Sequence, residues 1–192
     1  MKAIDILVDE HRLIMRMLQV IGRLEQLMGN GVAFQAAMIE RILDFMTGYT
    51  DEFHHHREED LLIDLLARHG HPMDHGPVGL VMQDHSMARF RTRRLRELLP
   101  AAAAGDSEAQ MEMRHLLDQY NKLVRCHIGM EDLSFFPHSR RTLTGEALEE
   151  LEDVFRAADA QPAARKIDKH YRALVEELEA EILELAKRNQ GG

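Results

Sequence analysis

The sequence predicts an all-α fold, an antiparallel up-down-up-down four-helix bundle with a C-terminal helical extension. Apolar residues recur at spacings of three and four over most of the chain, which is typical of amphipathic helices, and no stretch alternates like a strand. Aromatic residues make up only 5% of the 192 residues, while Leu, Ala and Glu are abundant, and this composition favours helices. The breaks between the periodic stretches are short, which is typical of antiparallel neighbours.

Turn-forming residues divide the chain into the expected helices. GNG follows the first helix, and HGHPMDHGP follows the second. Pro100 ends the third, Asp106 or Ser107 is the expected N-cap of the fourth, and Pro137 interrupts the fourth near its end. The expected helices cover about residues 2–28, 32–69, 77–99, 107–136, 145–158 and 163–189.

We expect two parts, a bundle domain over residues 1–140 and a helical extension over 141–192. The last helix carries apolar residues at helical spacing, a seam that suits packing on the bundle or a dimer interface. We favour packing on its own bundle and keep a homodimer as the alternative. The seam consists of Ile167, Tyr171, Leu174, Leu178, Ile182 and Leu185.

Charge and composition argue against several classes of partner. The net charge of −9 argues against a nucleic-acid partner, since phosphate binding needs a basic surface. The one basic run, ARFRTRRLREL, is interpreted as a solvated helix face paired with acids. A single cysteine, Cys126, fits a reducing compartment, and no apolar stretch is long enough to span a membrane or to act as a signal peptide. We therefore expect a cytoplasmic protein without membrane or nucleic-acid partners.

Histidines interrupt the apolar seams of the first four expected helices. His11 lies in the seam of the first helix and His85 in that of the third. The second and fourth seams each carry a histidine with a glutamate four residues later, so both side chains share one helix face. These pairs are His54 with Glu58 and His127 with Glu131. A carboxylate inside a bundle core is costly unless it is paired or bound to a metal.

The histidines also form an internal repeat. The order is a lone histidine and then His-x-x-x-Glu, twice, with nearly equal spacing in the two halves. A single histidine on an apolar face is commonly a satisfied core residue, and one His-x-x-x-Glu is commonly an ordinary ion pair. The doubled pattern instead predicts that the six side chains meet near mid-bundle and bind two metal ions, with Glu58 and Glu131 as bridges.

The stretch HHHREEDLL leaves the rotation of the second helix open. His54 with Glu58 and His55 with Glu59 have the same spacing, and adjacent residues differ by about 100° around a helix. Only one pair is then expected to face the core squarely. Leu61 and Leu65 favour the first pair, whereas Leu62 and Leu66 favour the second. We prefer His54 with Glu58, and we expect His56 to face solvent.

The motifs resemble those of the hemerythrin-like (HHE cation-binding) proteins. VDEHRLI resembles the motif of the family's first helix, and HHHREEDLL resembles that of its second. HGPVGLVMQDHSMARF resembles the entry to the third helix, and VRCHIGMEDLSFFP resembles the motif of the fourth. The resemblance covers about residues 1–140, and the tail from 144 to 190 resembles the extension of stand-alone bacterial members.

The resemblance implies a non-haem di-iron centre. Carried over by position, its ligands would be His11, His54, Glu58, His85, His127 and Glu131. Hemerythrins proper have a second histidine where this chain has Arg89, so one iron should have fewer histidine ligands. They also use an aspartate five residues after the last histidine, which would be Asp132. We favour Glu131 because of its spacing from His127.

The ligand set indicates the metal and its chemistry. Imidazole suits several transition metals, while bridging carboxylates in a bundle suit pairs of Fe or Mn. We expect two Fe ions, oxo- or hydroxo-bridged, with Zn or Mn as substitutes. An open position would accept O2, NO or peroxide (H2O2), so we favour a binding protein. The alternatives are a di-iron enzyme, with catalase-like or ferroxidase activity, and a protein that stores or donates iron.

Overall fold

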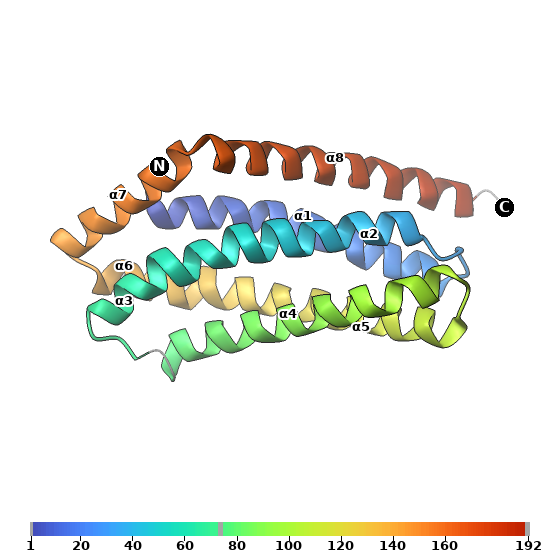
Figure 1. Cartoon of the computed structure of the whole chain (residues 1–192), viewed down its shortest axis with the longest axis horizontal. Coiled ribbons are helices and arrows are strands. Elements are labelled where there is room, and N and C mark those ends of the chain that lie inside the picture. The colour runs from blue at the N-terminus through green and yellow to red at the C-terminus, as the bar shows by residue number, and fades with distance from the viewer. Residues whose placement is uncertain (1, 73–74, 191–192) are drawn as a thin grey trace.

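The structure is a computed structural model, and it describes residues 2–72 and 75–190. All regular elements in these two ranges are helical, so the predicted all-α class is confirmed for them (Figure 1). The elements are α1 (Ala3–Gly29), α2 (Ala36–Phe45), η1 (Met46–His55), η2 (Glu58–Ile63), α3 (Asp64–Arg68), α4 (Gly76–Ala103), α5 (Ser107–Met130), η3 (Glu131–Phe135), α6 (Phe136–Thr142), α7 (Glu146–Ala160) and α8 (Pro162–Gln190). Elements labelled η are π-helical.

The long helices lie lengthwise beside one another. Figure 1 shows α1, the continuous run from α2 to α3, α4 and α5 as neighbouring rods, with α8 along the outside of the group. The most extensive packing joins α4 to α5, α1 to α5 and α1 to α8. α7 lies at the end where the chain turns into α8. None of the helices in the described ranges is both long and apolar enough to cross a membrane.

Most expected helix boundaries are confirmed within a few residues, but the predictions that Pro100 ends a helix and that Pro137 interrupts one were wrong. α4 continues past Pro100 to Ala103, because an internal proline removes only one helical hydrogen bond and the following alanines favour helix. Gly105, at φ 97°, follows the end of α4. Pro137 does not break the chain's helical course, because it lies in the first turn of α6, where its missing N–H is not needed.

Two further features bear on the boundaries. The Asp106 side chain caps α5 by accepting hydrogen bonds from the backbone N–H groups of Glu108 and Ala109. The expected break between the second and third helices includes residues 73 and 74, which lie outside the described residues.

The π-helical segments were not expected from the sequence. In η1 the backbone N–H of His56 donates to the carbonyl of Asp51, five residues earlier. In η3 the N–H of Phe136 donates to the carbonyl of Glu131 with the same spacing. Such widened turns are rare and occur frequently at functional sites. Here they coincide with the two His-x-x-x-Glu motifs.

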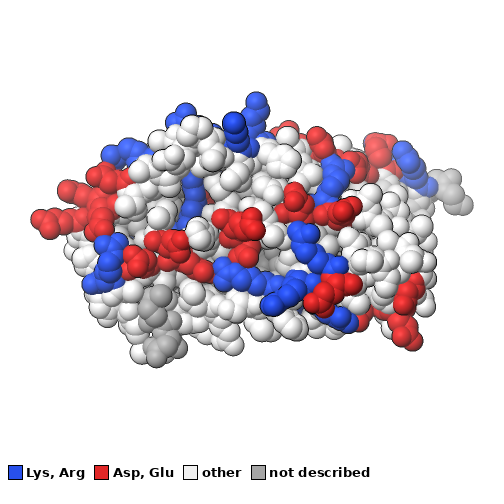
Figure 2. Space-filling view, in the orientation of Figure 1, with Lys and Arg blue, Asp and Glu red and all other residues white. Residues whose placement is uncertain are grey.

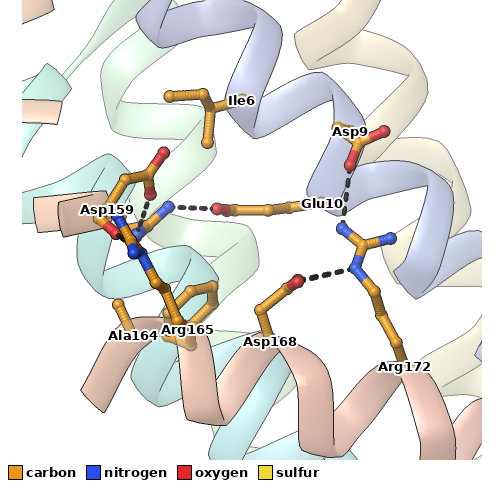
Figure 3. A pocket seen from close by; sticks show the side chains of 10 residues that line it. Ile6, Asp9, Glu10, Asp159, Ala164, Arg165, Asp168 and Arg172 are labelled. Atoms are coloured by element: carbon orange, nitrogen blue, oxygen red, sulfur yellow. Dashed lines mark hydrogen bonds and ion pairs between the residues drawn. The ribbon is translucent and has the colours of Figure 1, made fainter. Parts of the chain in front are cut away.

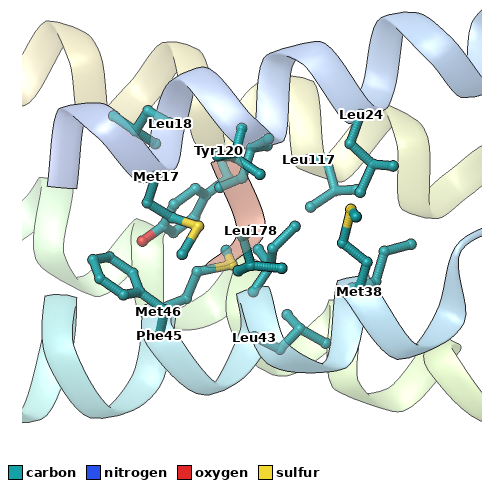
Figure 4. Close-up of a cluster of buried hydrophobic side chains, with 14 of the residues drawn as sticks. Met17, Leu18, Leu24, Met38, Leu43, Phe45, Met46, Leu117, Tyr120 and Leu178 are labelled. Atoms are coloured by element: carbon teal, nitrogen blue, oxygen red, sulfur yellow. The ribbon is translucent and has the colours of Figure 1, made fainter. Parts of the chain in front are cut away.

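The apolar core consists of two clusters along the bundle. The larger cluster joins α1, α2, η1, α4, α5 and α8, and Figure 4 shows part of it, including Met17, Phe45 and Tyr120. The smaller one includes Leu7 of α1, Val81 of α4 and Phe135 of η3. Along α1 and α4 a buried histidine separates the two clusters, so a polar layer divides the core.

α8 contributes to the larger cluster. Its buried residues are Tyr171, Leu174, Val175, Leu178, Ile182 and Ala186, and they pack within this same chain. Whether residues 1–140 and 141–192 are separate domains stays a prediction.

Gly48 lets α8 approach η1 closely. A Cβ atom at this position would lie 1.9 Å from the hydroxyl oxygen of Tyr171. We expect Gly48→Ala to lower the free energy of unfolding by about 1–3 kcal/mol, the usual cost of overpacking. Gly129→Ala is the control, because an added Cβ there meets nothing within 4 Å. Denaturant unfolding measures both, and equal stability of Gly48→Ala and the wild type would contradict this packing.

Candidate metal centre

The six side chains that the sequence singled out lie together between the two apolar clusters. They come from α1, from the run between α2 and α3, from α4, and from α5 with its continuation η3. The exposed fractions of the six residues lie between 0% and 3%. The set is His11 on α1, His54 on η1, Glu58 on η2, His85 on α4, His127 on α5 and Glu131 on η3.

The carboxylates of Glu58 and Glu131 lie between the histidines. Glu58 Oε1 is 3.6 Å from His54 Nε2, and Glu58 Oε2 is 3.2 Å from His85 Nε2. Glu131 Oε2 is 3.2 Å from the Nε2 atoms of both His11 and His127. Each carboxylate therefore joins one histidine pair to the other.

The ligand atoms fall into two overlapping groups. One consists of His11, His54, Glu58 and Glu131, and the other of His85, His127, Glu58 and Glu131. Within each group one ligand atom per residue lies within 4.8 Å of all the others. Both carboxylates belong to both groups, so the arrangement offers two adjacent cation positions with two shared ligands.

The buried polar atoms of this centre fit a metal. Among the described residues, His11 Nε2, His54 Nε2 and all four carboxylate oxygens of Glu58 and Glu131 lack a hydrogen-bond partner. Leaving buried donors and acceptors unpaired is costly, and for charged groups the cost is largest. Imidazole nitrogens with carboxylate oxygens are a donor set for transition metals such as iron. A bound cation would satisfy these atoms together.

Each of the four histidines has a second carboxylate behind it. His11 Nδ1 lies 2.8 Å from Asp132, His54 Nδ1 2.9 Å from Glu10, and His85 Nδ1 2.6 Å from Glu59. His127 Nδ1 lies 3.4 Å from Asp84. For His11, His54 and His85 this contact is a hydrogen bond that fixes the tautomer and aims the other nitrogen inward, as in metal-binding histidines. His127 Nδ1 faces Asp84 without a hydrogen bond.

The charges at the centre shift the pKa values of several groups. Burial lowers the pKa of His11, but the nearby carboxylates of Asp132 and Glu131 outweigh this and raise it to about 10. Burial also lowers the pKa of His85, but the nearby carboxylates of Glu58 and Glu59 outweigh this and raise it to about 9. Burial would raise the pKa of Glu58, yet His54 and His85 lower it to about 2. Without a cation, the excess negative charge is balanced by protons on histidines.

The structure places the alternative candidates beside the centre rather than between the two histidine pairs. Glu59 contacts His85 Nδ1 and also accepts from Arg89. Asp132 contacts His11 Nδ1 and is 35% exposed. His56 faces solvent, with 68% of its side chain exposed and Nε2 2.7 Å from Asp60.

His55 differs from the expectation that only one histidine of the run faces inward. Both His54 and His55 are buried, at 1% and 2% exposed. The His55 ring stacks on His85 with centroids 3.8 Å apart and planes 16° apart. The widened turns of η1 explain the departure, because the expectation assumed the rotation per residue of an α-helix.

Sequence reasoning also missed a buried arginine. Arg57 is 7% exposed and donates to Glu10 and to Asp159, each at 2.5 Å. Glu10 in turn holds His54, so this guanidinium ties the extension to the centre. The one available signal was its position directly before Glu58.

Two cavities reach the surroundings of the centre. One of about 360 Å³ lies between α1, η1 and α8, and Glu10 is part of its lining. Figure 3 shows the charged side chains of this cavity, with Arg172 paired to Asp9 and Asp168. The second, of about 180 Å³, is lined by His55, Arg89 and Tyr120 among others, and so reaches a ring that contacts His85.

The surface charges are mixed. On the face in Figure 2, acidic and basic side chains interleave. The arginine run of α4 follows this pattern, since Arg89 pairs with Asp51 and Arg94 pairs with Glu112.

Comparison with known protein families shows a match over most of the chain. The family model described as "Hemerythrin HHE cation binding domain" matches residues 2–139. No curated protein and no solved structure matches the chain. The matched range contains all six side chains of the centre.

Proposed function

This chain belongs to the hemerythrin HHE cation-binding domain family, and we propose that it is a non-haem di-iron protein that binds a small diatomic ligand, O2 or NO, or handles peroxide. The observation that carries the proposal is the pair of overlapping ligand groups that share Glu58 and Glu131. We take the four lengthwise segments to be the antiparallel four-helix bundle that the sequence predicts.

In this proposal each cation has two histidines and both carboxylates. His11 and His54 hold one ion, and His85 and His127 hold the other. Glu58 and Glu131 bridge, which agrees with their position between the pairs. Iron is favoured because carboxylate-bridged pairs inside helix bundles suit Fe or Mn, and the nitrogen-rich set suits Fe.

The protein's own residues restrict what reaches the metals. Bound iron supplies the redox chemistry by which a small ligand is held or reduced. The apolar clusters on both sides exclude bulk water, and the carboxylates at Nδ1 keep the histidines oriented. The cavity of about 180 Å³ beside His55 is small, so it suits a molecule of a few atoms.

Anaerobic loading with Fe(II) followed by air tests this proposal. We expect a new near-ultraviolet or visible absorption band when O2 or NO is added, and its reversal under argon identifies a binding protein. Irreversible oxidation would identify an oxidase, and O2 evolution from peroxide a catalase-like enzyme. His127→Ala is the control variant, because it lacks one of the proposed histidine ligands. An iron-loaded wild type that responds to none of the three molecules would contradict the proposal.

A further inference from the structure

We propose that His55 is a fifth histidine ligand of the centre and that it binds the ion held by His85 and His127. This inference rests on the proposed function, because it assumes that the cation positions are filled. It makes the centre asymmetric, with three histidines on one ion and two on the other.

The position of His55 supports this assignment. One ring nitrogen each from His55, His85 and His127 lie within 4.8 Å of one another, which forms a third group of candidate ligands in the described part of the chain. All three residues are buried. Within the described ranges, His55 Nδ1 makes no hydrogen bond that would hold the ring in its present orientation.

The surroundings of His55 repeat the pattern of the other four histidines. Its Nδ1 lies 3.4 Å from Asp51 Oδ1, the same distance that separates His127 Nδ1 from Asp84. Asp51 is itself held by Arg89 Nε at 2.7 Å. Every buried histidine of the centre thus has a carboxylate at Nδ1, an arrangement that leaves Nε2 for a metal. The exposed His56 lacks a carboxylate at Nδ1, since its contact with Asp60 is through Nε2.

Metal binding by His55 requires its ring to move from the position in the structure. The rings of His55 and His85 are stacked, and two parallel stacked rings do not aim their nitrogens at one point. Binding one ion by both requires the His55 ring to turn, and the cavity that it lines leaves room for this. The ion held by His11 and His54 then has fewer protein ligands than the ion held by His85 and His127.

The variant His55→Phe tests the assignment. Phenylalanine keeps a buried aromatic ring against His85 but offers no nitrogen. The probe is Fe(II), titrated anaerobically against a competing chelator. We expect one of two ions to bind about tenfold or more weaker, with the other unchanged. We also expect two inequivalent irons in the Mössbauer spectrum of the wild type and a changed signal for one of them. His56→Phe is the matched control, with unaltered binding.

A second variant keeps the test decisive if His55→Phe does not fold. Asp51→Asn removes the charge that faces His55 Nδ1 and pairs with Arg89, and we expect it to weaken binding of the same ion by a smaller factor. If a folded variant binds both irons with wild-type affinity and spectrum, the role of His55 is overturned while the di-iron proposal stands. A wild type that binds no iron overturns the di-iron proposal itself, and His55 with it.

Discussion

Replacing Glu131 with alanine is expected to lower the iron content from about two ions per chain to well below one. The reason is that its carboxylate lies within ligand distance of both histidine pairs, so its loss weakens both cation positions at once. His127→Ala removes a ligand of one position only, and we expect it to retain more iron than Glu131→Ala. Elemental analysis of each purified variant after anaerobic loading measures the difference.

The control for these variants is His56→Ala. His56 is adjacent to the same motif but exposed, and its contact is with Asp60. We expect its iron content to equal that of the wild type. Full iron retention in both Glu131→Ala and His127→Ala would show that the six side chains are a buried polar network and not a metal site.

The second large effect is the dependence of stability on pH in the metal-free protein. The pKa values of His11, about 10, and His85, about 9, lie above the ordinary value of 6.5. Their stabilising contribution is therefore fully present below about pH 6.5 and is lost as the pH rises through 9 to 10. The pKa of Glu58, about 2, lies below the ordinary 4.5, so its contribution is lost as the pH falls toward 2.

Burial lowers the pKa of His55 well below 6.5, so its contribution to stability falls as the pH drops below that value. We therefore expect the metal-free protein to be most stable near pH 6.5 and to lose on the order of a few kcal/mol by pH 10. A metal competes with these protons for the histidines. Metal loading near pH 7 therefore releases protons, and it removes the loss of stability at alkaline pH. Denaturant unfolding across pH, with metal-free and loaded protein side by side, measures this. A metal-free stability that stays level from pH 7 to 10 would contradict the charge arrangement.

The sequence predicts the inward faces well because the histidines lie in apolar seams of helical period. His11 and His85 follow this rule in regular α-helices, and both are buried as predicted. The seam does not reveal a change of helix type, so the burial of His55 in η1 was missed. A π-helical segment depends on tertiary packing and on what the site must hold, which a single sequence does not display.

The roles of the alternative carboxylates were also beyond sequence reasoning. Glu59 and Asp132 each follow an inward glutamate, and the sequence offered them only as competing ligands. In the structure they contact Nδ1 of His85 and His11, which lie on other helices. Spacing along one helix does not encode a partner across the bundle. The prediction that the third helix ends at Pro100 was wrong, because the loss of one helical hydrogen bond did not outweigh the stability of the surrounding helix.

Metal analysis of untagged wild-type protein, combined with its absorption spectrum before and after exposure to air, determines whether the six buried side chains bind two irons. We expect about two irons per chain and a new near-ultraviolet band on exposure to air. Zinc alone, or no metal in a protein that keeps its helical fold, would contradict this expectation.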